Sequence, residues 1–501
     1  MSEDLLLRAR ERHIAQVLAK QGLTQLAAAL GLSGLASPRR DAGPVDAVAP
    51  RNLRLALEEL GPTFVKIGQM LSTRGDVLSP AYRAELAKLQ DAAPSVPGDV
   101  IERIVEKELG AEAFARFDAQ PLASASIGQA HAARLHDGTE VVVKVRRPGA
   151  REQVEQDLAL LERFATRAAR HRRVLPHVDW VGLADEFARL LRAELDYERE
   201  GRNAERFAAH FATDSRVQIP RVYWKTTTAD VITLERMSGL KVTDGDALDE
   251  AGIDRGALAR LATDVLARMV FDDGLFHGDP HPGNFFVHAD GGLAIIDFGI
   301  VGALDDRLRE QLGDLLASVV RENPERTAAA LIALGASTGR VDQRALSDDL
   351  ATLLRRYSGR GIGEIRLNEV IAEVLEITRR HSLRLPPDLA LLAKTLVMAE
   401  GLAAALDPEF RISEALVPFA RRRLLAQLSP AALLKRLERL RLDGIDVHVR
   451  TSDLEPLVER LERLGNRIAL SVLAAAAINS LAELAAARRF RFTRIKRRRL
   501  M

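Results

Sequence analysis

Residues 276–302 read FHGDPHPGNFFVHADGGLAIIDFGIVG, a stretch in which short apolar runs alternate with clustered polar residues. Two apolar runs, NFFV and LAIID, flank the turn sequence HADGG, which predicts a β-hairpin. Asp279 and Asn284 precede its first strand and Asp297 ends its second, so the three side chains should meet at one edge of a sheet. Carboxylate and amide oxygens suit Mg²⁺, which commonly bridges phosphates. The stretch therefore predicts a site for Mg²⁺ and a phosphate group.

The spacing of these residues matches the catalytic loop and the metal-binding Asp-Phe-Gly motif of protein kinases. His277 and Asp279 are followed by Asn284, and the Asp-Phe-Gly that starts at Asp297 comes thirteen residues later. Both elements at this separation are a far more specific signal than Asp-Phe-Gly alone. One alternative is a metallohydrolase with His277, Asp279 and His281 as ligands. Another interpretation of His281 is that it only shapes the loop.

Lys144, in the run EVVVKV, is the candidate for the cation of such a site. An ammonium in an apolar β-run is costly without an anionic partner. A following helix with the sequence ELDYERE offers four acidic partners, which are Glu194, Asp196, Glu198 and Glu200. Our choice for the partner of Lys144 is Glu194. The alternatives are an edge-strand lysine in solvent and a solvated acidic helix face.

Composition limits the class of protein. The 501 residues are 47% hydrophobic and 28% charged, which indicates a globular chain of more than one packed unit. Aromatic residues are scarce at 4%, whereas helix-forming Ala, Leu and Arg are abundant, so most of the chain should be helical. Cysteine is absent, which excludes disulfides and thiolate metal sites and suits a reducing compartment. The net charge of +2 gives no reason to expect a nucleic acid partner.

The pattern along the chain predicts an α+β bilobal fold with helical extensions at both ends. An antiparallel hairpin is expected over residues 125–149, around the turn HDG. The expected divisions are an N-terminal helix and linker, a helical extension, a small mixed α/β lobe, a mostly helical lobe, and a C-terminal part with a hairpin, two helices and a basic tail. Their ranges are 1–45, 46–115, 116–240, 241–440 and 441–501.

Three features depart from a protein kinase. Residues 121–131, PLASASIGQAH, stand where a glycine-rich phosphate loop would be, and Ala and Ser restrict such a loop more than Gly. A helix is expected almost directly after Gly302, so a segment that seats a peptide substrate is missing. An early helix carries Lys66 and Gln69 three residues apart, hence on one face, with Arg74 beyond them.

In the order KxGQ, ASIGQAH, Lys144, ELDYERE, HGDPHPGN and DFG, these motifs resemble the UbiB family of atypical kinase-like proteins, which is tied to ubiquinone and other isoprenoid-quinone metabolism. The resemblance covers about residues 50–480. It implies a kinase-like fold, ATP or ADP with Mg²⁺, and ATPase or phosphotransferase rather than protein-kinase behaviour. It also implies that the early helix with Lys66, Gln69 and Arg74 lies over the active site.

The resemblance assigns a role to each candidate residue. Lys144 would contact the α- and β-phosphates and pair with Glu194, Asp279 would be the catalytic base, and Asn284 with Asp297 would hold the metal. Glu235 to Met237 would form the adenine-binding hinge. The residues implied to cover the phosphates are Ala123, Ser124, Ala125, Ser126, Ile127, Gly128 and Gln129.

The C-terminal end suggests contact with a membrane surface. Residues 454–470 predict an amphipathic helix for the C-lobe or a second subunit, which would make a homodimer. Residues 468–487 are a weak candidate for a single membrane span. Eight of the twelve residues from Arg488 to Arg499 are basic, a composition that suits an anionic membrane or a solvated tail. Since no signal peptide is apparent, we expect a cytoplasmic protein, peripheral at the inner membrane face.

Two other functions remain open. A small-molecule phosphotransferase of the aminoglycoside or choline kinase type also uses HGDxxxxN, but has no counterpart of the Lys66 helix. A nucleotide-gated scaffold for quinone-biosynthesis enzymes would keep the nucleotide site and need no phosphoryl acceptor. The expected ligands are therefore a nucleotide and, under the first interpretation, a quinone precursor or lipid.

Overall fold

The computed structural model describes residues 3–32, 49–72, 74, 77–89, 94–170, 179–337, 341–358, 364–416 and 419. All of them belong to Met1–Arg423, one of the two units into which the chain divides. The predictions for 441–501, including the amphipathic helix, the Ala-rich helix and the basic tail, lie outside the described residues.

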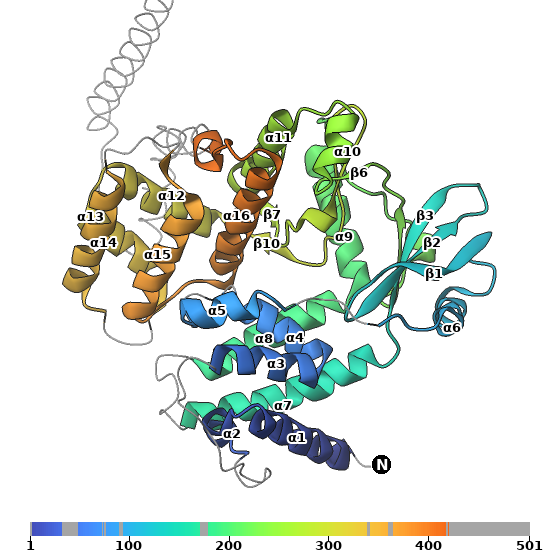
Figure 1. Ribbon diagram of the computed structural model, residues 1–501, viewed down its shortest axis with the longest axis horizontal. Helices are drawn as coiled ribbons and strands as arrows, with labels where there is room; N and C mark the ends of the chain where they lie inside the picture. The colour runs from blue at the N-terminus through green and yellow to red at the C-terminus, as the bar shows by residue number, and fades with distance from the viewer. Residues whose placement is uncertain are drawn as a thin grey trace, which may run out of the picture. The chain divides into compact units, whose positions relative to one another are not determined.

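An antiparallel four-stranded sheet, in the order β1-β2-β3-β5, forms the smaller lobe (Figure 1). Its strands are β1 (Arg116–Ser124), β2 (Gly128–Arg134), β3 (Glu140–Arg146) and β5 (Val231–Glu235). The hairpin predicted over 125–149 is confirmed as β2 and β3, in which Ala130 pairs with Lys144. Val141, Val143 and Val145 pack with α6 (Gly98–Leu109) in one core. Because side chains alternate along a strand, Lys144 faces away from that core.

A second small sheet confirms the hairpin predicted within the opening stretch. Its order is β4-β9-β8-β6. The strands are β4 (Val217–Gln218), β9 (Leu293–Ile295), β8 (Phe285–Val287) and β6 (Leu240–Lys241). Phe285 pairs with Ile295. Beside this sheet, β7 (Leu275–His277) pairs antiparallel with β10 (Val301–Ala303), so the loops that carry Asp279 and Asp297 lie at adjoining strand ends.

The larger lobe is helical, as predicted. Its hydrophobic core is formed by residues of the hairpin strands and of the helices. The helix expected soon after Gly302 is present as α12, whose N-cap Asp305 accepts a hydrogen bond from the Leu308 N–H at 2.7 Å. The helices are α9 (Tyr197–Phe211), α10 (Gly245–Glu250), α11 (Arg255–Ala267) with its π-helical continuation η2 (Arg268–Asp273), α12 (Asp306–Val320), α13 (Pro324–Leu334), α14 (Gln343–Tyr357), α15 (Leu367–Arg380) and α16 (Pro387–Leu406). Two strands of two residues each, β11 (Ala336–Ser337) and β12 (Leu383–Arg384), pair antiparallel within this lobe.

Helix α16 is apolar on nearly every side. Within the described part of the chain it is the one helix with the length and hydropathy to cross a membrane. Yet Leu392, Leu402 and Leu406 are buried in the lobe core, and α16 packs along α11 (Figure 1). Of the apolar window of this helix, 39% is buried inside the structure, so α16 is a partly buried helix of the lobe core.

The N-terminal helices form a separate layer with its own core. Helices α1 (Glu3–Lys20), α2 (Thr24–Ala29), α3 (Ala49–Leu60), α4 (Pro62–Ser72) and α5 (Pro80–Leu86) lie beside α7 (Ala150–Arg170) and α8 (Trp180–Glu194) (Figure 1). A largely buried ion pair joins α1 to α7, with Arg10 Nε 2.8 Å from Asp157 Oδ1. This layer brings α4, with Lys66 and Gln69, to α8.

Candidate active site

Lys144 lies between two carboxylates that come from different parts of the chain. Its Nζ donates to Glu200 Oε1 at 2.5 Å and lies 3.4 Å from Asp297 Oδ2. The predicted partner, Glu194, is wrong: it forms an ion pair with Lys66 instead. The reason is a helix break inside ELDYERE. Glu194 ends α8, whereas Asp196 caps α9 and turns Glu200 toward β3.

The charges of this cluster determine the protonation of its members. Burial alone would lower the pKa of Lys144, but the carboxylates of Asp297 and Glu200 outweigh it and raise that pKa, so the side chain is an ammonium. Burial raises the pKa of Glu200 against the opposing effect of Lys144. Burial would also raise the pKa of Asp297, yet Lys144 and His277 lower it to about 2. One cation between two carboxylates leaves a net negative site, which can accept a divalent metal ion.

The Asp-Phe-Gly segment is held in a single orientation. Asp297 has a φ of 66°, in the left-handed region that short polar side chains tolerate better than others, and its Oδ1 accepts from the Gly299 N–H at 3.2 Å. Phe298 is buried against Phe207 of α9, with ring centroids 5.0 Å apart. The Asn203 amide donates to the Phe298 carbonyl at 3.0 Å. These contacts direct the Asp297 carboxylate toward Lys144.

The catalytic loop is shaped by its own side chains. His277 Nδ1 accepts from the Asp279 N–H at 3.1 Å, and burial lowers the pKa of this imidazole, so it is neutral. His281 Nδ1 accepts from the Gly283 N–H at 3.1 Å within the turn η3 (Pro282–Asn284). Both rings therefore serve the backbone of the loop, which favours the loop-shaping interpretation over metal ligation. Across the described residues, no three His, Asp or Glu side chains gather as a metal-binding group.

Asn284 and Asp297 are the residues that fit a magnesium ion. The Asn284 amide nitrogen donates to the Asp279 carbonyl at 3.1 Å, and this bond does not use the amide oxygen. The Asp297 side chain is 47% exposed, so its carboxylate can reach a ligand. A carboxylate and an amide oxygen, with phosphate and water completing the shell, match the preferences of Mg²⁺.

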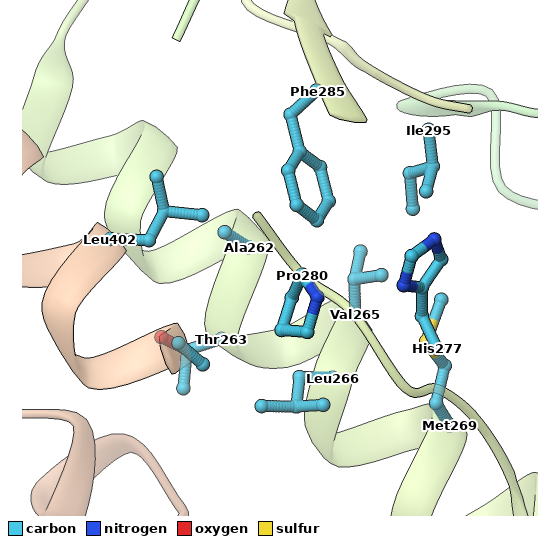
Figure 2. Close-up of a pocket in the computed structure, with 11 residues that line it drawn as sticks. Ala262, Thr263, Val265, Leu266, Met269, His277, Pro280, Phe285, Ile295 and Leu402 are labelled. Atoms are coloured by element: carbon cyan, nitrogen blue, oxygen red, sulfur yellow. The ribbon is translucent and has the colours of Figure 1, made fainter. Parts of the chain in front are cut away.

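The back of the catalytic loop rests on an apolar cavity of about 30 Å³ between α11 and α16. Figure 2 shows Leu402 of α16 and His277 at opposite sides of it, with Pro280 between them and Leu266 of α11 next to Pro280. An apolar cavity of this kind does not hold water well. The catalytic loop therefore has apolar side chains on one side and the polar cluster on the other.

The turn at residues 125–128 is fixed from outside. The Arg147 guanidinium donates to the Ala125 carbonyl at 2.8 Å and to Ser124 Oγ at 2.7 Å. Ile127 is buried in the core of the N-terminal helices. A Cβ on Gly128 would lie 2.2 Å from Tyr197 Oη, so only glycine fits. Unlike a mobile glycine-rich loop, this turn is tied to its neighbours.

The rest of the predicted nucleotide residues have clear positions. Gln129 is 2% exposed and its Oε1 accepts from the Val96 N–H at 2.5 Å, so its side chain is structural. Ala123 pairs with Ala130 on the sheet, and Ser126 is buried in the turn. Glu235 is the last residue of β5. Met237 follows it, where the chain leaves the sheet of the smaller lobe and continues to β6.

Helix α4 is joined to α8 and to its own neighbours. Lys66 pairs with Glu194, and Arg74 Nη1 lies 2.5 Å from Glu186 Oε2. Gln69 Nε2 donates to the Leu89 carbonyl at 3.1 Å. The positive charge of Lys66 also contributes to the low pKa of Asp297, after the larger effects already described. Lys66, near the middle of α4, is therefore close enough to influence the site.

One residue of the site was missed in the sequence. Lys394 of α16 lies with its Nζ 2.9 Å from Asp279 Oδ1. The cost of a cation in an apolar segment, the argument that selected Lys144, also applies to the run LALLAKTLVMA. Chain distance hid the pairing, because 115 residues separate the two partners.

The fold has two lobes, and its site combines the Lys144–Glu200 pair with Asp279, Asn284 and Asp297. Together these features define a kinase-like protein. Family models agree: residues 88–331 match the ABC1 atypical kinase-like domain, and residues 350–411 match the UbiB helical domain. The chain belongs to this family of ABC1/UbiB atypical kinase-like proteins.

One named relative belongs to the same family, and two other proteins are similar to this chain. A probable protein kinase UbiB of Xylella fastidiosa (strain 9a5c) is 38% identical over 420 residues, which are 82% of this chain and 76% of the relative. An uncharacterised protein of Synechocystis is 37% identical over 372 residues, and the match spans 74% of this chain but 64% of that protein's length. The solved complex of Rv3197 with erythromycin, from Mycobacterium tuberculosis, is 28% identical, with a TM-score of 0.47, over 73% of this chain and 94% of that one.

Proposed function

We propose that the protein binds ATP with Mg²⁺ and cleaves its terminal phosphoanhydride bond, with water or a small lipid-like molecule as acceptor, in support of isoprenoid-quinone metabolism. The observation that carries the proposal is the cluster of Lys144, Glu200 and Asp297 facing the loop with Asp279 and Asn284. A cation for phosphates, a metal-binding pair and a carboxylate for the acceptor are the parts that phosphoryl transfer requires.

Each residue then has a defined task. Lys144, held by Glu200, would contact the α- and β-phosphates. Asn284 and Asp297 would hold Mg²⁺, which when bound neutralises charge on the phosphate oxygens. Asp279 would orient the acceptor hydroxyl or water and take its proton, as the new P–O bond forms and ADP leaves with the electrons of the broken one.

The remaining contacts to the nucleotide are also proposals. The turn from Ala123 to Gln129 would cover the phosphates through backbone N–H groups. Because Arg147 and Ile127 tie this turn to its surroundings, it would form a fixed cover rather than a closing flap. The segment from Glu235 to Met237 would hold adenine.

Helix α4 would fill the place of a peptide substrate, with Lys66, Gln69 and Arg74 fixing it there. The ion pair from Lys66 to Glu194 and the bond from Gln69 to Leu89 support this proposal, since they hold the helix in place without a substrate. The absence of a peptide-seating segment between Gly302 and α12 is consistent with it. An acceptor would then be small or membrane-derived, such as a quinone precursor.

The test is ATP turnover by the purified full chain, with and without anionic liposomes and a soluble quinone-precursor mimic. Asp297→Asn should lower turnover by at least about 100-fold, because it removes the charge of a metal ligand. Asp249→Asn, at an exposed carboxylate paired with Arg255, makes the same chemical change elsewhere and should leave turnover unchanged.

The outcomes separate the alternatives. Phosphate release that persists in Asp297→Asn would refute the proposed site. If the protein binds nucleotide without hydrolysing it and also binds other enzymes of quinone biosynthesis, the scaffold function would be favoured. Transfer to an aminoglycoside or choline at a rate above hydrolysis would favour the small-molecule phosphotransferase.

A further inference from the structure

Helix α16 contacts the catalytic loop at three positions along one face. Leu391 lies against Gly278, where a Cβ would be only 2.9 Å from its Cδ2. Thr395 Oγ1 donates to the His277 carbonyl at 3.3 Å. Between them, Lys394 Nζ donates to Asp279 Oδ1 at 2.9 Å. Since residues three and four apart share a helix face, one face of α16 holds the whole start of the loop.

The ion pair at the centre of this face has no obvious value for stability. Lys394 is 22% exposed and Asp279 36% exposed, so both lose part of their hydration. A partly exposed ion pair of this kind contributes little to stability. The other side chains of α16 show that the helix accepts apolar residues almost everywhere. A lysine at this one place therefore points to a role in the site.

The geometry assigns a partner to one of the two carboxylate oxygens of Asp279. Oδ1 accepts from Lys394, which fixes the rotation of the carboxylate. Oδ2 is then the oxygen that can meet an incoming hydroxyl or water. Within the loop, the position after Pro280 holds His281, whose Nδ1 accepts from the Gly283 N–H.

We propose that Lys394 is a positioning residue for phosphoryl transfer: from α16, it fixes the Asp279 carboxylate so that one oxygen faces the acceptor. The helical domain thereby completes a site whose other members lie in the kinase-like domain. This inference rests on the proposed function. It predicts that loss of the ammonium lowers the rate of the chemical step and leaves nucleotide affinity nearly intact, because Lys394 touches Asp279 and Lys144 holds the phosphates.

The experiment compares Lys394→Met with wild type in ATP turnover and in equilibrium binding of a fluorescent ATP analogue with Mg²⁺. A well-positioned general base contributes about 10²–10⁴-fold, and a misoriented one loses part of this, so kcat should fall about 10- to 100-fold. The Kd for the analogue should change by less than about threefold. Lys225→Met removes an exposed lysine from the smaller lobe and is the matched control.

A double-variant cycle tests whether Lys394 acts through Asp279. In an Asp279→Asn background, Lys394→Met should cause little further loss, since residues that act as a unit are not additive. Lys394→Arg keeps the charge and should recover part of kcat. If the melting temperature of Lys394→Met falls, Lys394→Gln takes its place in the same cycle.

Each result decides the matter. An unchanged kcat in a folded Lys394 variant, or an equal loss with and without Asp279, overturns the inference alone, provided that Asp297→Asn has abolished turnover. A parallel loss of nucleotide affinity would assign Lys394 to nucleotide binding and also overturn it. A wild-type protein that does not turn ATP over overturns both proposals.

Discussion

Replacement of Glu200 by glutamine tests the central ion pair. The Lys144 Nζ to Glu200 Oε1 distance is 2.5 Å, with side-chain exposures of 18% and 6%. Breaking a buried pair costs about 3–5 kcal/mol when it leaves an uncompensated charge. Here Asp297 lies 3.4 Å from the same ammonium, and glutamine still accepts a hydrogen bond. We therefore expect the free energy of unfolding to fall by about 2–3 kcal/mol, at or below the lower limit of that range.

The same change should weaken nucleotide use. Without Glu200, Lys144 turns to Asp297, which removes the cation from the phosphates and occupies a metal ligand. A fall in kcat/KM of about 100-fold, equivalent to about 2.7 kcal/mol, is expected. Phosphate release measures it, and thermal unfolding measures stability. Glu155→Gln is the control, because its pair with Arg192 is half exposed and should contribute less than about 1 kcal/mol.

Glu194→Gln provides the decisive comparison. It leaves the Lys144–Glu200 pair in place and loosens α4 through Lys66, so nucleotide affinity should change by less than about threefold, or about 0.6 kcal/mol. If Glu194→Gln removed nucleotide binding while Glu200→Gln retained it, the assignment of Glu200 as the partner of Lys144 would be refuted.

Three other predictions concern pH, packing and access. Burial depresses the pKa of His277, so its stabilising contribution is present above pH about 6.5 and lost as pH falls; His277→Gln should flatten the decline of melting temperature between pH 7 and 5, and an unaltered slope would contradict this. Gly128→Ala should destabilise by about 1–3 kcal/mol by denaturant unfolding, with partial recovery when Tyr197→Phe removes the clashing hydroxyl, whereas Gly401→Ala, which meets nothing within 4 Å, should not destabilise. Lys66→Ala should release α4 and speed nucleotide exchange in stopped-flow fluorescence at least about threefold, given the loss of a largely buried ion pair; an unchanged rate would count against an occluding helix.

Local patterns predicted the parts of the site that neighbouring residues build. The hairpin between Asn284 and Asp297 follows from two apolar runs and a glycine turn, and the position of Lys144 follows from strand alternation. The error at Glu194 has a local origin too: Asp196 is an N-cap, and the new helix rotates its acidic residues relative to α8. A capping residue inside an acidic run was the available signal.

Contacts over long chain distances were beyond the sequence pattern. The tie from Arg147 to Ser124 and the seating of Ile127 among the N-terminal helices depend on how layers pack, which periodicity does not specify. The pairing of Lys394 with Asp279 is of the same kind. A lysine in an apolar helix indicates that burying its charge costs free energy. The sequence does not indicate which of the many carboxylates pairs with it.

The contact of α16 with the catalytic loop also changes what counts as one functional unit. The match to the kinase-like domain ends at residue 331, and Lys394, which donates a hydrogen bond to Asp279, comes 63 residues later. A fragment cut at that boundary would retain Lys144, Asn284 and Asp297, the residues proposed to bind phosphate and metal, but it would lose the ion pair that holds the Asp279 carboxylate. Substitutions within Pro387–Leu406 belong, in their effects, with those of the loop 276–284. Under the proposed role of Lys394, the kinase-like and helical domains would form one unit for the reaction as well as for folding.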